Sequence, residues 1–216
     1  MFLRDSFFSY GKFFIKNDLK FLKKKIKIQN LYENNIGMPI LSTYLRTSSA
    51  NLIHHASYFE TFLNKFNITN KLSYVFEFGG GYGSFARYVL AKKNLSYAIY
   101  DFEIFTHIQN FYLSNLFKKK KIEYYYKISQ LEKIKIKKNS LFVSTFALSE
   151  CPLKLRNIFK KFITNFDYIL LTFQKNFEEY DNYSYFENFL NKRKYMIEII
   201  EMKNRKNMYY LFAKKL

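Results

Sequence analysis

Four glycines within five residues form the part of this sequence best suited to hold a ligand. Gly79, Gly80, Gly81 and Gly83 lie in the stretch V-F-E-F-G-G-G-Y-G-S, which spans 75–84. Glycine tolerates positive φ and has no Cβ, so a ligand can approach the backbone closely. The residues before the glycines are aromatic or β-branched, which is typical of a buried strand, and those after them have helical spacing. The N-terminus of such a helix directs N–H groups and partial positive charge at the loop.

Two acids accompany this loop. Glu77 lies two residues before the first glycine, and Asp101 lies 18 residues beyond Gly83, at the end of the hydrophobic run 97–100. In nucleotide-binding α/β folds an acid at the end of the second strand accepts hydrogen bonds from ribose hydroxyls. The pattern therefore predicts a nucleotide-like ligand. The alternative is a close crossing of helix and strand that binds nothing.

Three short motifs together resemble a known family. They are E-F-G-G-G-Y-G-S at 77–84, Y-A-I-Y-D-F at 97–102 and F-A-L-S-E at 146–150. They are similar to motifs of the class I S-adenosylmethionine-dependent methyltransferases, and most similar to the sugar O-methyltransferase family. That family typically reads E-x-G-G-G-Y-G, then Asp after strand two, Q-x-x-Y-L, and S-E after strand four. The resemblance covers roughly 41–175.

The resemblance implies a cofactor, a substrate class and roles for particular residues. The cofactor would be S-adenosyl-L-methionine, contacted by Glu77, Gly79, Gly80, Gly81, Tyr82, Gly83, Asp101 and Phe102. The acceptor would be a sugar hydroxyl, contacted by Ser149, Gln109 and Tyr112. No metal is expected, although the spacing of Asp101, Glu103 and His107 is compatible with one.

A sugar hydroxyl is a poor nucleophile, so a base that removes its proton should help methyl transfer. Glu150 follows the strand expected at 141–147, and ligands of open α/β sheets lie outside such strand ends. The alternative for Glu150 is an acid that stabilises a helix N-terminus. His54 and His55, on a helix expected at 49–66, are the next candidates because imidazole titrates near neutrality. Their alternative is an ordinary surface or half-buried side chain.

Two other functions compete with methyl transfer. The stretch 81–86 also matches G-x-G-x-x-A, a dinucleotide fingerprint, so an NAD-dependent oxidoreductase with a Rossmann fold is one alternative. The expected strands at 195–202 and 208–214, joined by a polar turn, would form a terminal hairpin. Such a hairpin favours a methyltransferase, because a nicotinamide-binding fold usually continues with parallel strands. A non-catalytic basic binding module is the other alternative, but the lysines are spread along the chain.

The elements that must position these residues alternate between strand and helix. Strands are expected at 73–78, 96–101, 122–126, 141–147 and 166–173, and helices at 84–93, 103–117, 152–164 and 178–193. This order predicts an α/β, Rossmann-like methyltransferase fold. Its mostly parallel seven-stranded sheet would end in a C-terminal antiparallel hairpin, with helices on both faces. We expect residues 1–40 to form a basic, aromatic extension that is helical or partly disordered, and 41–216 to form the methyltransferase domain.

Composition limits the partners. The formal net charge of +19 comes with high Lys, Asn, Ile, Phe and Tyr contents together, as an AT-rich coding sequence would produce, so we discount it. We expect a small-molecule or glycan substrate and no nucleic acid. No apolar run reaches bilayer length, although the N-terminal extension allows weak association with a membrane surface. Cys151 is the only cysteine, which excludes an internal disulfide and suggests a cytoplasmic protein. The oligomeric state is left open.

Overall fold

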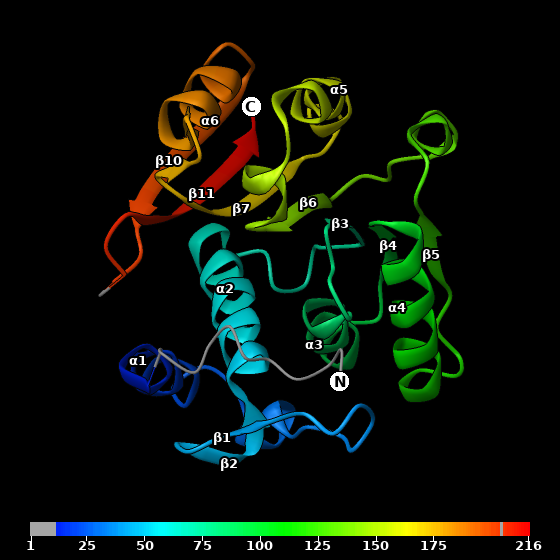
Figure 1. The fold of residues 1–216 in the computed structure, drawn as a ribbon, viewed down its shortest axis with the longest axis vertical. Helices are drawn as coiled ribbons and strands as arrows, with labels where there is room; N and C mark the ends of the chain where they lie inside the picture. The colour runs from blue at the N-terminus through cyan, green and yellow to red at the C-terminus, as the bar shows by residue number, and fades with distance from the viewer. Residues whose placement is uncertain (1–11, 204) are drawn as a thin grey trace. The chain divides into compact units, whose positions relative to one another are not determined.

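Seven strands form one mixed sheet in the order β10-β11-β7-β6-β3-β4-β5 (Figure 1). The structure is a computed structural model that describes residues 12–203 and 205–216. The strands are β3 (Tyr74–Phe78), β4 (Ser96–Tyr100), β5 (Ile122–Tyr125), β6 (Ser140–Thr145), β7 (Tyr168–Gln174), β10 (Tyr195–Glu201) and β11 (Met208–Lys215). Strands β5, β4, β3, β6 and β7 are parallel neighbours, whereas β11 is antiparallel to both β7 and β10. The predicted sheet with its C-terminal antiparallel hairpin is confirmed.

The chain divides into two compact units. The first takes the described part of Met1–Thr69, with Gly81–Asn94 and Ile108–Lys120. The second takes Asn70–Gly80, Leu95–His107 and Lys121–Leu216, and it contains the whole seven-stranded sheet. The glycine loop passes from the second unit into the first between Gly80 and Gly81. The predicted division between residues 40 and 41 stays a prediction.

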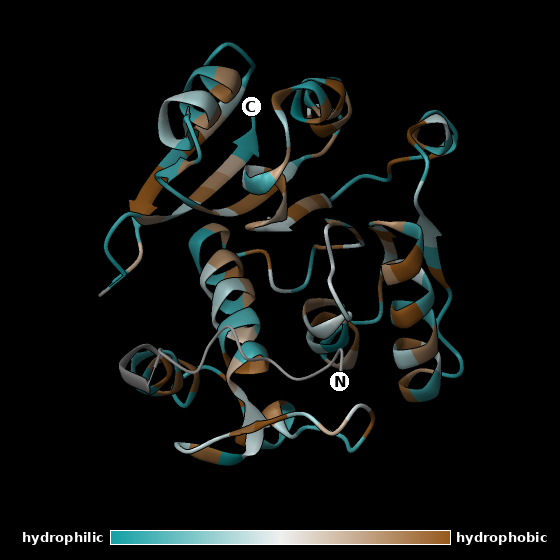
Figure 2. Cartoon of the chain, in the orientation of Figure 1, coloured by the Kyte–Doolittle hydropathy of each residue, from teal (hydrophilic) through white to brown (hydrophobic). Residues whose placement is uncertain are grey.

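One face of the sheet carries the hydrophobic core of the second unit. Successive strand side chains point to opposite faces, so Phe76 and Phe78 share a face that Glu77 does not. On their face they join Phe159 of α5 (Leu153–Ile163) and Phe186 of α6 (Asn182–Asn191) in one buried cluster. Figure 2 shows α5 with both hydrophobic and hydrophilic segments, as expected of a helix with one buried side.

Helix α6 begins later than the sequence predicts. In place of a helix from Glu178, a short hairpin of β8 (Asn176–Phe177) and β9 (Tyr180–Asp181) comes first. Glu178 has a φ of 51°, which a helix cannot include. The Asp181 side chain accepts a hydrogen bond from the Ser184 N–H and so defines the N-cap of α6.

The first unit is built around α2 (Ala50–Phe66), which confirms the helix expected there. Ser49 caps its start by accepting from the Leu52 N–H, and Asn67, at a left-handed φ of 51°, ends it. The other elements include α1 (Lys12–Leu22), η1 (Ile28–Leu31), the hairpin strands β1 (Leu41–Ser42) and β2 (Leu45–Ser49), and α3 (Ser84–Lys92). Helix α4 (Glu103–Leu116) starts in the second unit and continues into the first.

The N-terminal extension is described from residue 12, so predictions for 1–11 lie outside the described residues. In α1 the side chains of Ile15, Leu19 and Leu22 are buried. This segment therefore packs as an amphipathic helix within its unit. In residues 12–203 and 205–216, no helix combines the length and the apolar character that crossing a bilayer requires.

Candidate functional site

Hydrogen bonds join the carboxyl ends of neighbouring strands in the second unit. The Ser144 hydroxyl of β6 donates to the Phe78 carbonyl at the end of β3 (3.0 Å). The Gly79 N–H donates to the Tyr100 carbonyl at the end of β4 (2.8 Å), and the Asp101 N–H donates to Tyr125 of β5 (3.0 Å). The turns that follow β3, β4 and β6 are therefore held at one edge of the sheet, where ligands of open α/β sheets bind.

Gly79 cannot carry a side chain. Its φ is +75°, and a Cβ at this position would lie 2.1 Å from the Cβ of Ala147 in the turn after β6. The sequence predicts glycine here because a ligand approaches the backbone. The structure gives another reason, since a second segment of the same chain occupies the space.

Asp101 and Phe102 follow β4 at this edge. One carboxylate oxygen of Asp101 accepts a hydrogen bond from the Phe102 N–H (2.8 Å), and the Asp101 side chain is half-buried. The Phe102 ring is 73% exposed. A carboxylate beside an exposed aromatic ring offers an acceptor for hydroxyl groups and an apolar surface for a planar base.

Glu77 is buried on the sheet face opposite Phe78, where Tyr97 donates a hydrogen bond to its carboxyl (2.7 Å). Burial raises the pKa of Glu77 to about 8. The Tyr97 hydrogen bond opposes this shift, and the charge of Asp101 adds to it. The Glu77 carboxyl therefore takes up a proton far more readily than an ordinary glutamate. The group that Glu77 contacts directly in this structure is the Tyr97 hydroxyl.

The turn after β6 carries Ser149 and Glu150. It begins at Phe146, whose φ of 67° and ψ of −38° are unusual for a bulky residue, and such strain is concentrated at functional sites. The short helix η3 (Ala147–Glu150) follows. The side-chain amide of Gln174 lies 3.3 Å from the Ser149 hydroxyl and 3.3 Å from the Glu150 carboxylate. Glu150 is exposed, so its carboxylate is accessible at the strand edge.

Arg156 holds this turn through hydrogen bonds to its backbone, and this role was not predicted from the sequence. Its side chain is 1% exposed and donates to the carbonyl oxygens of Ser149 (2.5 Å) and Cys151 (2.6 Å) and to the Asn182 side chain (2.6 Å). The scarcity of arginine could have drawn attention to this residue, because Arg156 is one of only six arginines among 36 basic residues.

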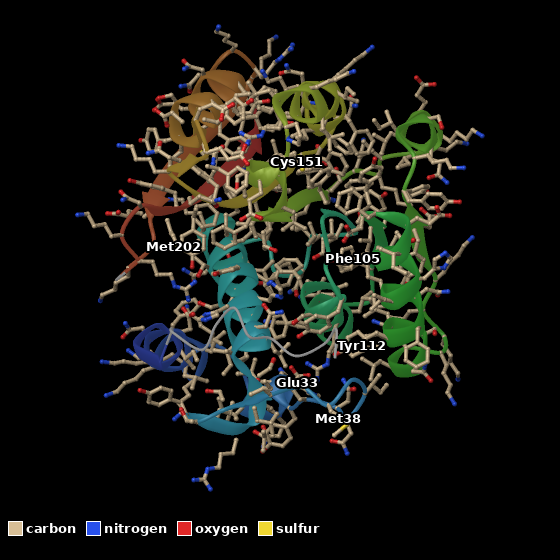
Figure 3. All side chains as sticks on the ribbon, viewed as in Figure 1. Glu33, Met38, Phe105, Tyr112, Cys151 and Met202 are labelled. Carbon is tan, nitrogen blue, oxygen red and sulfur yellow. The ribbon has the colours of Figure 1, made fainter. Side chains whose placement is uncertain are left out.

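Cys151, labelled in Figure 3, follows Glu150 in the same turn. Burial raises the pKa of its thiol to about 11.

The rest of the glycine loop lies in the first unit. Gly83 has a φ of +101° and precedes α3, and a Cβ there would lie 3.3 Å from Leu113. The Gln109 side chain is buried and donates to the Gly81 carbonyl (2.8 Å). The Tyr82 ring meets the edge of Tyr112, with centroids 5.6 Å apart.

Tyr112, labelled in Figure 3, is 2% exposed and accepts a hydrogen bond from the Asn34 side chain (3.1 Å). The sequence predicts that Gln109 and Tyr112 contact the acceptor. In the structure, Gln109 binds Gly81 of the glycine loop and the Tyr112 ring packs against Tyr82.

The two candidate histidines have packed surroundings in α2. His54 is 1% exposed and its Nδ1 contacts the Asp18 carboxylate, which also accepts from the Ser57 hydroxyl. The His55 ring meets the edge of Phe85 at a centroid distance of 5.7 Å. Burial, and then the neighbouring His54, lower the pKa of His55 to about 3, so its ring is neutral and weakly basic at pH 7.

The predicted site residues therefore form separate groups. The structure brings Gly79, Gly80, Asp101, Phe102, Ser149 and Glu150 to one edge of the second unit. Gly81, Tyr82, Gly83, Gln109 and Tyr112 form a group in the first unit, which also contains His54 and His55. In the described residues, His, Cys, Asp and Glu form no group of three suited to a metal ion. The expectation that none is needed stays a prediction.

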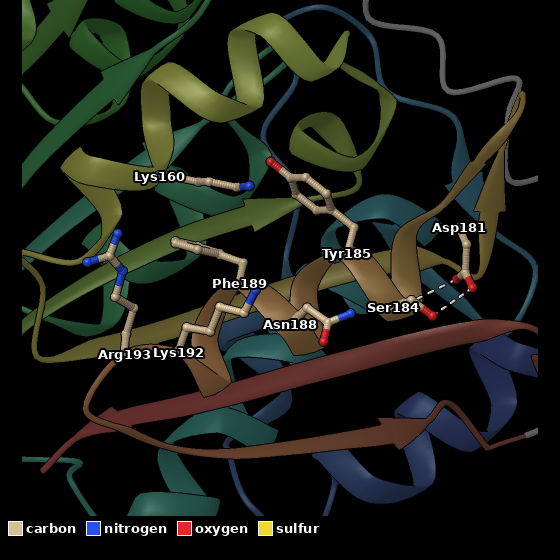
Figure 4. Close-up of a pocket in the computed structure, with 8 residues that line it drawn as sticks. All are labelled: Lys160, Asp181, Ser184, Tyr185, Asn188, Phe189, Lys192 and Arg193. Atoms are coloured by element: carbon tan, nitrogen blue, oxygen red, sulfur yellow. Dashed lines mark hydrogen bonds between the residues drawn. The ribbon is translucent and has the colours of Figure 1, made fainter.

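A groove of about 460 Å³ lies along α5 and α6, outside this sheet edge (Figure 4). The Lys160 ammonium lies 4.5 Å from the centroid of the Tyr185 ring, and Ser184 donates to Asp181 at the far end. This groove contains none of the predicted site residues.

Comparisons with known proteins identify the fold. No family model and no curated protein matches the sequence. Among solved structures, magnesium protoporphyrin IX methyltransferase from Synechocystis PCC 6803, solved with bound SAM, has a TM-score of 0.59 at 11% identity. That alignment covers 94% of this chain and 97% of the enzyme. An rRNA methylase from Streptococcus thermophilus has a TM-score of 0.54 at 14% identity, covering 72% of this chain and 93% of that protein.

Mitomycin 7-O-methyltransferase has a TM-score of 0.56 at 12% identity. The alignment covers 79% of this chain but only 56% of that enzyme. Together with the strand order, these likenesses show that the chain has the Rossmann-like fold of S-adenosylmethionine-dependent methyltransferases.

Proposed function

We propose that this protein is an S-adenosylmethionine-dependent methyltransferase that methylates a sugar hydroxyl. The observation that carries the proposal is the edge at which the turns after β3, β4 and β6 meet. There Gly79 and Gly80, the acid Asp101 and the exposed acid Glu150 lie on three neighbouring strand ends.

The residues at this edge fit the cofactor. Asp101 would accept hydrogen bonds from its ribose hydroxyls, and the exposed ring of Phe102 would cover its base. When bound, S-adenosylmethionine supplies a methyl group on an activated sulfonium. The protein's main task is then to align the acceptor with that methyl group. Glycines 81 and 83 with Tyr82 continue the same loop, and their contact with the cofactor remains part of the proposal.

Glu150 is the proposed base for the acceptor hydroxyl. Its carboxylate is exposed, and the Gln174 amide at 3.3 Å orients it. Ser149, whose hydroxyl also lies 3.3 Å from Gln174, would bind the acceptor next to it. His54, buried against Asp18, and His55, with its low pKa, are weaker candidates for this role.

The choice of a sugar as the acceptor rests on the motif resemblance. The solved structures with this fold include proteins named as an rRNA methylase, a porphyrin methyltransferase and a mitomycin O-methyltransferase. The fold therefore serves chemically different acceptors, and nucleic acid is among the acceptors to test.

The test combines binding and turnover. Calorimetric titration of the full chain with S-adenosylmethionine and, separately, with NAD should show binding of the methyl donor alone. Labelled methyl donor would then be incubated with sugar nucleotides, oligosaccharides, RNA and small amines. Label in a sugar supports the whole proposal, and label in RNA or an amine overturns the sugar part alone. Binding of NAD without binding of the methyl donor would overturn the enzyme class.

A further inference from the structure

A second pocket, of about 370 Å³, lies in the second unit beside the first residues of β3 and β4. Four lysines line it, Lys121, Lys133, Lys135 and Lys137, and Glu123 is the only acidic residue in its lining. Tyr74, which also lines the pocket, is separated from Phe78 by the length of β3, four residue steps or about 13 Å. The pocket is therefore distinct from the proposed methyl-transfer edge.

The local sequence explains why lysines converge here. Residues 133–137 read K-I-K-I-K, and Ile134 and Ile136 pack against the buried core. Ile134 has extended dihedrals, with φ of −79° and ψ of 120°. Lys133 ends the short helix η2 (Ile128–Lys133), and the chain beyond it is not helical. In an extended chain alternate side chains share a side, about 6.6–6.8 Å apart, so Lys135 and Lys137 lie on the side opposite the isoleucines. Core packing of the two isoleucines thereby places the three lysines at the pocket.

The residues that line the pocket carry a net positive charge. Four lysines face one glutamate, whose carboxylate already accepts a hydrogen bond from the Tyr125 hydroxyl (3.0 Å). The Lys137 ammonium donates to the neutral Ser96 hydroxyl (2.7 Å). Lysines that line the same pocket repel one another, and a multivalent anion would relieve that repulsion.

A buried donor completes the site. Tyr74 is 2% exposed, and its hydroxyl has no hydrogen-bond partner in the described part of the chain. Buried hydroxyls without a partner are uncommon and call for an explanation. Burial raises the pKa of Tyr74, so the hydroxyl keeps its proton and can donate to an anionic oxygen.

We propose that this pocket binds a compact polyphosphate, meaning two or three linked phosphate groups, with Lys133, Lys135 and Lys137 as its cations and Tyr74 as a hydrogen-bond donor. The phosphate groups are either free or attached to a nucleoside. The pocket volume lies at the lower end of the range for small-ligand sites, which suits so small a group. This proposal does not depend on methyl transfer.

The test uses the full chain and isothermal titration at constant ionic strength. Affinity should rise from phosphate through pyrophosphate to tripolyphosphate, with sulfate as the anion control. The triple variant Lys133→Gln/Lys135→Gln/Lys137→Gln should bind tripolyphosphate at least roughly tenfold more weakly. The matched control, Lys154→Gln/Lys203→Gln/Lys214→Gln, removes the same charge from exposed positions elsewhere in the second unit and should bind as the wild type does.

The Tyr74→Phe variant keeps the ring and removes only the donor, so it should weaken binding by several-fold. Equal affinity in Tyr74→Phe, equal losses in the two triple variants, or no binding of tripolyphosphate would each overturn the proposal. A nucleoside triphosphate that binds more tightly than tripolyphosphate indicates a nucleotide, and equal affinity indicates the free polyphosphate. A single-stranded oligonucleotide that binds here far more tightly than both would contradict a compact ligand.

Discussion

Gly79 and Ala147 approach so closely that a Cβ on Gly79 would lie 2.1 Å from the Cβ of Ala147. The two residues belong to the turns after β3 and β6, so this contact holds two sides of the proposed cofactor edge together. Gly79→Ala should therefore reduce the free energy of unfolding by roughly 2–5 kcal/mol, from the overlap and from the positive φ. Urea denaturation measures this change.

Two variants separate these causes. Gly81→Ala meets no atom within 4 Å of its new Cβ and retains only the strain of a φ of +56°, so it should lose roughly 1 kcal/mol. Gly79→Ala/Ala147→Gly removes the overlap and should recover part of the loss. A double variant no more stable than Gly79→Ala would show that the contact with Ala147 is not the cause.

Glu77 makes stability depend on pH. Its pKa rises from 4.5 to about 8 on folding, mainly through burial. A buried acid with a raised pKa contributes its full stability below pH 4.5, and that stability is lost as the pH rises to about 8. Glu77→Gln does not titrate but can still accept the Tyr97 hydrogen bond. Relative to this variant, the wild type should lose roughly 4–5 kcal/mol between those pH values, measured by urea denaturation across the range. Parallel curves for the two proteins would contradict the raised pKa.

Asp101 should determine the affinity for the methyl donor. Asp101→Ala removes the proposed ribose acceptor and should weaken calorimetric binding of S-adenosylmethionine by roughly 10- to 100-fold. Glu103→Gln, which removes a carboxylate charge two residues along the chain at an exposed position, is the matched control and should bind normally. If both variants bind as the wild type does, Asp101 does not hold the ribose.

Glu150 should act on turnover more than on cofactor binding. On a confirmed hydroxyl acceptor, Glu150→Gln should lower kcat by roughly 10²- to 10⁴-fold, because the amide keeps the shape of the carboxylate but cannot take a proton. Its affinity for S-adenosylmethionine should be unchanged. Full turnover in Glu150→Gln would exclude it as the base, and His54 and His55 would then be tested.

Arg156 should position Ser149 and Glu150 without contacting the ligand. Arg156→Lys keeps the charge but cannot reproduce the three hydrogen bonds to Ser149, Cys151 and Asn182, so we expect a loss of roughly 2–4 kcal/mol. Amide hydrogen exchange should accelerate in 147–151, a change that general destabilisation would not restrict to this turn. Lys154→Gln, exposed on the same helix, is the control. Unchanged exchange in 147–151 would show that Arg156 does not hold the turn.

Local patterns in the sequence were sufficient to predict most elements of the sheet. The alternation of strand and helix, the glycine loop before α3 and the C-terminal hairpin all depend on residues close together in the chain, as does helical or strand periodicity. The same locality explains the incorrect start of α6. A positive φ at Glu178 and a cap at Asp181 arise from the β8–β9 pairing, which helix periodicity does not encode.

The sequence by itself determined that glycines, Asp101 and Glu150 follow separate strands, because each motif lies within one short segment. Only the tertiary structure decided why Gly79 must be glycine, since Ala147 lies in the turn after β6, 68 residues later in the chain. It also decided that Arg156 is buried and donates to the Ser149 carbonyl, and that His54 contacts Asp18. Those partners are set by the packing of distant segments, and a side chain's burial and pKa depend on that packing rather than on its neighbours in the chain.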